Sequence, residues 1–158
     1  HFIGPIQSNK TKGIARSFNW VHSINRLKIA YQLNEYRPLN LKPLNVCLHI
    51  NLIEEQSKSG ISPEQVTELA LAVSQLPHLK LRGLMTIPPS LKDPQMQYEV
   101  FMRLNQLMHL LNQKLGLNMD TLSMGMSDDL ISAVKAGATI VRIGRAIFGE
   151  RQKSSNTV

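Results

Sequence analysis

The chain has 158 residues, a mass of 17.8 kDa and a formal net charge of +7. Hydrophobic residues make up 42% of it and charged residues 18%, which is ordinary for a globular protein and excludes wholesale disorder. No apolar run approaches the roughly 18 residues that a membrane-spanning helix needs. Because Cys47 is the single cysteine, a disulfide framework and a multi-thiolate metal site are both excluded within the chain.

The positive charge is concentrated in residues 1–45. This segment holds seven basic side chains against one acid, Glu35, whereas the remaining 113 residues hold eleven basic and ten acidic groups. A basic segment can indicate nucleic-acid binding. However, no helix-turn-helix or RNP-like pattern is present, and aromatic residues for base stacking make up only 5% of the chain. We therefore interpret the segment as a solvated basic face and do not expect nucleic acid as a partner.

Short extended runs alternate with amphipathic stretches along the chain. In order, we expect strands and helices at these positions: a strand at 2–4, a strand at 20–24, a helix capped by Asn25 and ending at Leu33, a strand at 44–51, a helix at 63–76, a strand at 81–87, a helix at 94–115, a strand at 121–124, a helix at 127–137 and a strand at 139–144. Such alternation is the signature of a parallel β/α fold.

Capping residues mark the expected helix boundaries. Residues 62–65 (Ser-Pro-Glu-Gln) read as a capping box with proline at the first helical position. Asp93 and Pro94 begin the longest helix, and Gly116 ends it. Residues 127–129 (Ser-Asp-Asp) begin the last helix, with two acids in its first turn where they complement the helix dipole.

The strand at 44–51 helps to choose between the two parallel β/α folds, the open doubly wound sheet and the closed barrel. A parallel strand between two helix layers should be apolar on both faces. A barrel strand can instead turn a polar face toward a ligand-lined interior. No GxGxxG or GxxxxGK[ST] fingerprint of a nucleotide-binding fold is present. The strand alternates, which favours a barrel: one face carries Leu44, Val46, Leu48 and Ile50, and the other carries Asn45, Cys47, His49 and Asn51.

Two segments near the C-terminal end form a candidate phosphate cradle. Residues 123–129 (SMGMSDD) and 141–149 (VRIGRAIFG) would follow the last two strands, where barrels of this type commonly hold phosphate. Ser127 offers a hydroxyl and helix N-terminal N–H groups, and Gly144 lets a backbone N–H approach an anion closely. The alternative is that Ser127 only caps its helix and Gly144 only turns the chain.

Arg142 is a candidate interior residue. If Val141 and Ile143 pack against the outer helices, Arg142 points into the barrel, where its permanent charge must meet either a structural ion pair or a ligand. Met85, near the end of a strand, is a second candidate pocket residue. His49 faces the interior either as a hydrogen-bonded core residue or as a catalytic one. The five histidines show no metal-ligand spacing, so no metal site is expected.

Several stretches, taken in order, resemble the pyridoxal 5′-phosphate (PLP) homeostasis proteins, the YggS/PROSC family. The match covers nearly the whole chain and includes Asn51 with residues 55–60, which look like the family's Asn and ExxKxG segment at the barrel rim. The stretches that carry the resemblance are 1–10, 20–24, 51–60, 82–88, 123–129 and 141–149.

This resemblance implies an α/β fold, a (β/α)8 TIM-type barrel like the N-terminal domain of alanine racemase, with PLP at its C-terminal rim. Arg142 would face the pyridine nitrogen and keep it unprotonated, which weakens the ring as an electron sink. Relatives often carry a small hydroxyl residue where this chain has Arg145, so the phosphate contact is expected to differ there. The implied cofactor-binding residues are Arg142, Gly144, Arg145, Ser127, Met126, Ser123 and Met85.

Six strands are visible, whereas a (β/α)8 barrel has eight and typically about 250 residues. We therefore expect this chain to lack about the first two β/α units. Residues 1–151 would then form a partial PLP-binding barrel and 152–158 a C-terminal tail. The family's Schiff-base lysine lies on the first barrel strand, so it is expected upstream of His1, and no catalytic residue is expected within the chain.

The resemblance implies a cytoplasmic PLP carrier or regulator rather than an enzyme, which binds, buffers and transfers PLP and thereby affects amino-acid and keto-acid balance. Its expected partners are PLP and the PLP-dependent apoenzymes that receive it, with no membrane partner, and its expected state is a monomer or a weak dimer. The alternative is an alanine-racemase-like, PLP-dependent amino-acid racemase. Such an enzyme needs a second acid/base, typically a tyrosine from a further domain, whereas all three tyrosines of this chain fall in or beside helical segments.

Overall fold

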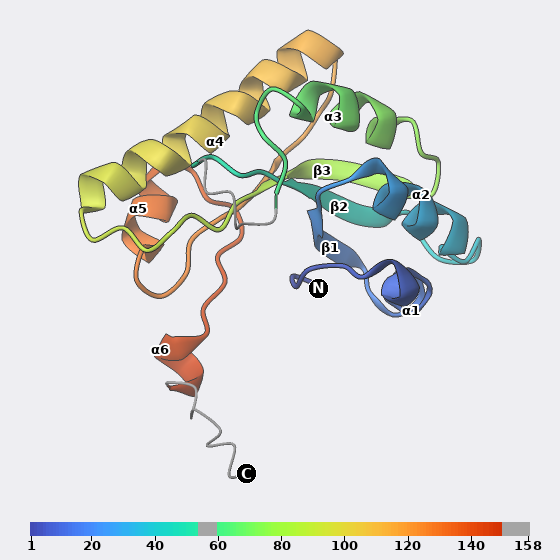
Figure 1. Cartoon of the computed structure of the whole chain (residues 1–158), viewed down its shortest axis with the longest axis horizontal. Coiled ribbons are helices and arrows are strands. Elements are labelled where there is room, and N and C mark those ends of the chain that lie inside the picture. The colour runs from blue at the N-terminus through green and yellow to red at the C-terminus, as the bar shows by residue number, and fades with distance from the viewer. Residues whose placement is uncertain (54–59, 150–158) are drawn as a thin grey trace.

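The computed structural model describes residues 1–53 and 60–149, and its centre is one parallel sheet (Figure 1). The strands follow one another in sequence order as β1 (Trp20–Ile24), β2 (Leu44–His49), β3 (Leu79–Met85) and β4 (Thr121–Ser123). The helices are η1 (Ser8–Lys10), α1 (Thr11–Ser17), α2 (Leu27–Tyr36), α3 (Val66–Ser74), α4 (Pro94–Leu115), α5 (Leu130–Lys135) and α6 (Arg145–Phe148).

The sheet continues by one residue pair at each edge. Phe2 bridges to Val21 of β1, and Ile140 bridges to Ser123 of β4, both in parallel. The six parallel segments therefore lie in the predicted order, but the strands predicted at 2–4 and 139–144 are wrong in extent. Beyond Ile140 the ladder stops, because the N–H of Arg142 donates to the carbonyl of Gly125, past the end of β4.

The helices cover the sheet in the same order as the strands. Contacts link α1 to α2, α2 to α3, α3 to α4 and α4 to α5, and Figure 1 shows these helices following one another around the sheet. A doubly wound sheet reverses its strand order and carries helices on both faces. Sequential parallel strands joined by crossovers of one hand place all helices on one side, as in a barrel.

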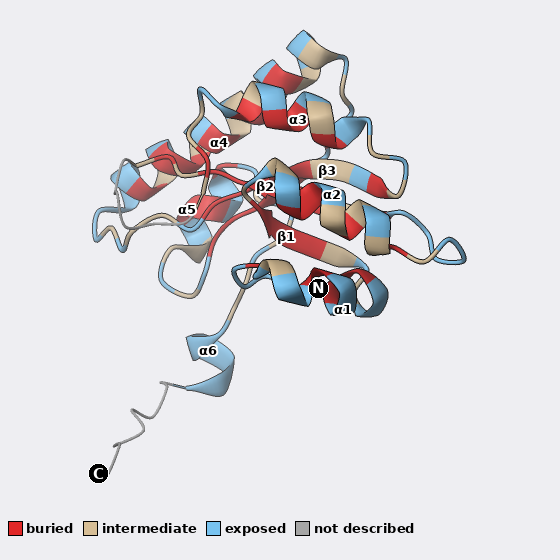
Figure 2. Ribbon diagram, turned by 45° about the vertical axis from the view of Figure 1, so that its right-hand side comes forward, coloured by how far each residue is buried: buried red, intermediate tan, exposed pale blue. Residues whose placement is uncertain are grey.

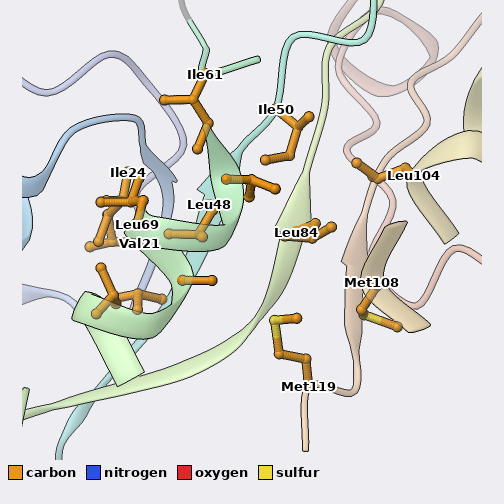
Figure 3. Packing of buried hydrophobic residues seen from close by; sticks show 14 of the residues in the cluster. Val21, Ile24, Leu48, Ile50, Ile61, Leu69, Leu84, Leu104, Met108 and Met119 are labelled. Atoms are coloured by element: carbon orange, nitrogen blue, oxygen red, sulfur yellow. The ribbon is translucent and has the colours of Figure 1, made fainter. Parts of the chain in front are cut away.

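One hydrophobic cluster joins the helix-facing side of the sheet to the helices (Figure 3). It contains the apolar face predicted for β2, with Leu48 fully buried, together with Leu84 of β3, Leu69 of α3 and Leu104 of α4. Figure 2 shows the same arrangement as buried residues on the strands and on the inward faces of the helices, whereas α6 is exposed. Each fully buried leucine contributes about 1.5–3 kcal/mol of transfer free energy, so this cluster stabilises the sheet.

Gly83 allows β3 and β4 to approach closely. A Cβ atom at this position would lie 1.7 Å from the carbonyl oxygen of Thr121, far inside van der Waals contact. The close approach brings Leu84 and Met85 into register with Leu122 and Ser123 of β4.

The predicted helix starts were only partly right. The longest helix was correct, because Asp93 accepts a hydrogen bond from the N–H of Gln95 and Gly116 ends α4 with φ +64°. The capping box at 62–65 is wrong: these residues form a turn that redirects the chain after Ile61 has bridged to Ile50, and α3 starts at Val66.

The other two helix starts are also displaced, and two helical stretches were missed, residues 8–17 and α6. The N-cap of α2 is Arg26 rather than Asn25, and α5 begins at Leu130, after a turn at 127–129. The stretch 8–17, which forms η1 and α1, lacks a long apolar stripe, and within α1 only Thr11, Ile14 and Ala15 are buried. In the part of the chain that the structure describes, no helix has the length and hydropathy to cross a membrane.

Candidate functional site

The site is built on the face of the sheet that turns away from the helices. His49, Met85 and Ser123 are register partners on β2, β3 and β4, so their side chains form a row across this face near the C-terminal ends of the strands. All three are buried, and none belongs to the hydrophobic cluster under the helices. The alternation predicted for β2 is therefore confirmed, and its polar face lines the interior.

Arg142 reaches this row from the segment after Ile140. Its Nη1 donates to Ser123 Oγ at 2.8 Å, and its Nη2 donates to the backbone carbonyl of Thr86 at 2.9 Å. Burial lowers the pKa of Arg142, but a guanidinium keeps its charge because its ordinary pKa lies far above neutral pH. The guanidinium is thus held by a hydroxyl and a carbonyl, and no carboxylate among the described residues forms an ion pair with it.

His22 reaches the same interior from β1, the strand at the opposite edge of the sheet from β4. Its Nδ1 lies 2.7 Å from Ser123 Oγ, although β1 and β4 are separated by β2 and β3. In a flat sheet, three strand spacings would place these strands about 14 Å apart, beyond the reach of a histidine and a serine. The sheet must therefore curve around His22, as a barrel wall does.

The buried ionisable groups of this interior are held in their neutral forms. Burial lowers the pKa of His22 to about 4, with a further contribution from the Arg142 charge. Burial and the Arg142 charge likewise lower the pKa of His49 to about 4. Burial also raises the pKa of Cys47 to about 12, so its thiol is inert at neutral pH. Among the described residues that face this interior, Arg142 carries the full charge.

A cavity of about 730 Å³ opens beside Arg142. It brings together five of the residues predicted for the site: Arg142, Gly144, Arg145, Ser127 and Met126. The other lining residues come from 88–91, from Gln97 of α4, from Asp128 and Asp129, and from Phe148 and Gly149. Ser123 and Met85 do not line it, because both are fully buried: Ser123 lies behind Arg142, and Met85 lies beside Ser123 in the interior row.

The rim of the cavity combines a hydroxyl, backbone N–H groups and paired charges. Ser127 Oγ accepts a hydrogen bond from the N–H of Ala146 at 3.2 Å, so this hydroxyl links the 127–129 turn to the start of α6. Arg145 forms an ion pair with Asp128, and both side chains are largely exposed. A Cβ atom at Gly144 would meet no atom within 4 Å, so the space next to this backbone is open.

This arrangement suits a small molecule that carries a phosphate group. Its volume lies within the 300–1,000 Å³ that is usual for small-molecule sites. The hydrogen bonds of the described residues do not use the N–H groups of Gly144 and Arg145 at the start of α6, and two guanidinium groups lie nearby. Among the described residues, no cluster of His, Cys, Asp and Glu side chains could hold a metal ion.

Some contributors were missed by the sequence analysis. The side chain of His22 lies on the opposite face of β1 from that of Val21. This alternation is the only feature of the sequence that indicates an interior position for His22. Thr86 acts through its backbone carbonyl, which no side-chain pattern reveals. Residues 54–59, which include most of the segment that resembles the family's ExxKxG motif, lie outside the described residues.

The sequence matches the family described as "Alanine racemase, N-terminal domain" over residues 2–152. The chain belongs to this family. Its fold is accordingly that of the parallel β/α barrel that the sequence analysis expected, with the helices outside and the polar strand faces inside.

Three known proteins show where in the family the chain lies. It is 60% identical over 151 residues to the pyridoxal phosphate homeostasis protein of Pseudomonas aeruginosa, which covers 96% of this chain. The structure is similar to PipY of Synechococcus elongatus PCC7942, solved with PLP bound, with a TM-score of 0.84 and 31% identity over 92% of this chain. An alanine racemase of Clostridium difficile 630 covers 96% of this chain at a TM-score of 0.75, but its 14% identity extends the likeness to the fold alone.

The chain spans only part of each of these proteins. It covers 64% of the Pseudomonas protein, 68% of PipY and 41% of the alanine racemase.

Proposed function

We propose that this protein binds PLP in the cavity beside Arg142 and takes part in PLP homeostasis as a carrier that stores and passes on the cofactor. The observation that carries the proposal is the half-buried, permanently charged Arg142 at the wall of a cavity whose rim offers Ser127, Gly144 and Arg145. The 60% identity to a pyridoxal phosphate homeostasis protein supports it.

The chemistry of the described residues fits PLP. Within the described part of the chain, Ser123 Oγ and the Thr86 carbonyl take two of the five N–H donors of Arg142, which leaves donors for an acceptor such as a pyridine nitrogen. The phosphate would be held by the Ser127 hydroxyl, the N–H groups at Gly144 and Arg145, and the Arg145 guanidinium.

PLP supplies a reactive aldehyde and an electron-withdrawing ring. In our proposal this chain orients the ring and limits its reactivity. Because a guanidinium has donors and no acceptor, Arg142 would leave the pyridine nitrogen unprotonated, and an unprotonated ring stabilises negative charge poorly. This favours a carrier over an enzyme that turns over amino acids. None of the described tyrosines lines the cavity, so the described residues offer no tyrosine as a second acid/base for racemisation.

The test uses ligands without the aldehyde, so that binding does not depend on any lysine. Pyridoxine 5′-phosphate, pyridoxine and benzyl phosphate are titrated into the chain by calorimetry. We expect pyridoxine 5′-phosphate to bind most tightly, because pyridoxine lacks the phosphate and benzyl phosphate lacks the ring nitrogen. Arg142→Ala should abolish the preference for the nitrogen-containing ring, and Ser127→Ala should weaken both phosphorylated ligands.

The matched control is Arg16→Ala, which removes an exposed arginine on α1, outside the cavity. It should bind all three ligands as the wild type does. Equal affinity of the wild type for pyridoxine and pyridoxine 5′-phosphate would refute the phosphate site. Rapid exchange of the α-hydrogen of alanine with solvent, in the presence of PLP, would overturn the carrier role in favour of a racemase.

A further inference from the structure

A chain of hydrogen bonds, fully buried only at its centre, runs behind Arg142, away from the cavity. Arg142 Nη1 meets Ser123 Oγ at 2.8 Å, Ser123 Oγ meets His22 Nδ1 at 2.7 Å, and His22 Nε2 meets His1 Nδ1 at 3.0 Å. Ser123 and His22 are both buried. Neither side chain lines the cavity, so the proposed ligand would contact neither of them.

The donors and acceptors of this chain can be assigned from chemistry. A guanidinium only donates, so Ser123 Oγ accepts from Arg142. The described residues give this hydroxyl one other polar neighbour, His22 Nδ1, and a buried hydroxyl hydrogen needs an acceptor. Ser123 therefore donates to an unprotonated His22 Nδ1, and His22 carries its proton on Nε2, from which it donates to His1 Nδ1. The lowered pKa of His22 agrees with this neutral tautomer.

We infer that His22 is a positioning residue for Arg142, acting through Ser123. By accepting the hydroxyl hydrogen, His22 turns a lone pair of Ser123 Oγ toward Arg142 Nη1. The carbonyl of Thr86 fixes Nη2, so these two acceptors set the plane of the guanidinium and the direction of its remaining donors. This inference rests on the proposed function, in which those donors meet a ring nitrogen.

The position of His22 explains why a residue three strands away can act on the site. It lies on β1, the opposite edge strand from β4, and reaches Ser123 only because the sheet curves. A shift of β1 relative to β4 would therefore be transmitted to Arg142. Retention of the ligand would depend on the closed curvature of the sheet as well as on the rim residues.

The decisive comparison uses two variants and two ligands. His22→Asn keeps an acceptor, the amide oxygen, near the position of Nδ1, whereas His22→Leu removes it. We expect His22→Leu to bind pyridoxine 5′-phosphate about fivefold to tenfold more weakly than the wild type, the effect of one buried hydrogen bond. Its affinity for benzyl phosphate, which has no ring nitrogen, should be unchanged. His22→Asn should stay within about twofold of the wild type for both ligands.

Each outcome decides between the inference and its rivals. If His22→Leu weakens both ligands equally, or neither, His22 has only a structural role or none, and the inference is wrong. If the wild type itself does not prefer pyridoxine 5′-phosphate to pyridoxine, the proposed function fails, and the inference fails with it.

A measurement on the wild type covers the case in which His22→Leu does not fold. Nitrogen-15 NMR of labelled histidine reports the tautomer of His22 directly. Protonated Nε2 and unprotonated Nδ1 at neutral pH support the assignment, and the opposite tautomer overturns it.

Discussion

Mild acid should destabilise this fold through two buried histidines, His22 and His49. Each has a pKa of about 4 in the folded chain, compared with about 6.5 when unfolded. Between these values the unfolded state binds more protons than the folded state. Because folding lowers both pKa values, the free energy of unfolding falls as the pH drops from about 6.5 toward about 4.

The magnitude follows from the size of the two shifts. Well inside this window each histidine changes the free energy of unfolding by about 1 kcal/mol per pH unit. Between about pH 6.5 and about pH 5 the two together remove about 3 kcal/mol, a large part of the stability of an ordinary domain. Carboxylates with lowered pKa, such as Asp120, titrate mainly below this range and add little to it.

Urea unfolding followed by circular dichroism at a series of pH values measures this dependence. His22→Asn should lose about half of the slope, because only His49 then remains to titrate. His109→Gln, a substitution at an exposed position of α4, should keep the wild-type slope. A wild-type free energy of unfolding that stays constant over this window would refute the burial argument, as would an unchanged slope in His22→Asn.

Two further predictions concern packing and the cavity rim. Gly83→Ala should lower the free energy of unfolding by several kcal/mol, about 3 or more, because its Cβ would lie 1.7 Å from the carbonyl oxygen of Thr121. Gly13→Ala, in α1 with nothing within 4 Å of the new Cβ, should be neutral or slightly stabilising in the same urea unfolding measurement. Asp128→Asn should tighten the binding of pyridoxine 5′-phosphate about twofold to fivefold, because it releases Arg145 from an exposed ion pair. That gain should vanish at high salt, and a gain that persists there would contradict the electrostatic explanation.

The layout of the fold could be predicted because periodicity and burial agree along most of the chain. The alternation of Leu44, Val46, Leu48 and Ile50 with polar residues identified a one-sided strand, and the structure buries that apolar face under the helices. Helix starts were less predictable, since a cap residue such as Ser62 is also a good turn residue. Ile61 forms a bridge with Ile50, and this pairing favours a turn over a helix start at Ser62.

The candidate site could be predicted only where the type of side chain itself indicates a role. Arg142 stood out because a permanent charge among apolar neighbours needs a partner, and the structure holds it by Ser123 and Thr86. The ion pair considered as its alternative is absent among the described residues. His22 could not be assigned from sequence, because its role depends on how strongly the sheet curves, a tertiary property that no local pattern encodes.

The contact between His22 and Ser123 also has a consequence for synthesis on the ribosome. The two residues are 101 positions apart. At about 5–20 residues per second, His22 is made roughly 5–20 seconds before the serine that satisfies it. During that interval His22 lacks its hydrogen-bond partner Ser123 and remains exposed to solvent. The interior of the curved sheet can therefore close around His22 only after β4 has been made.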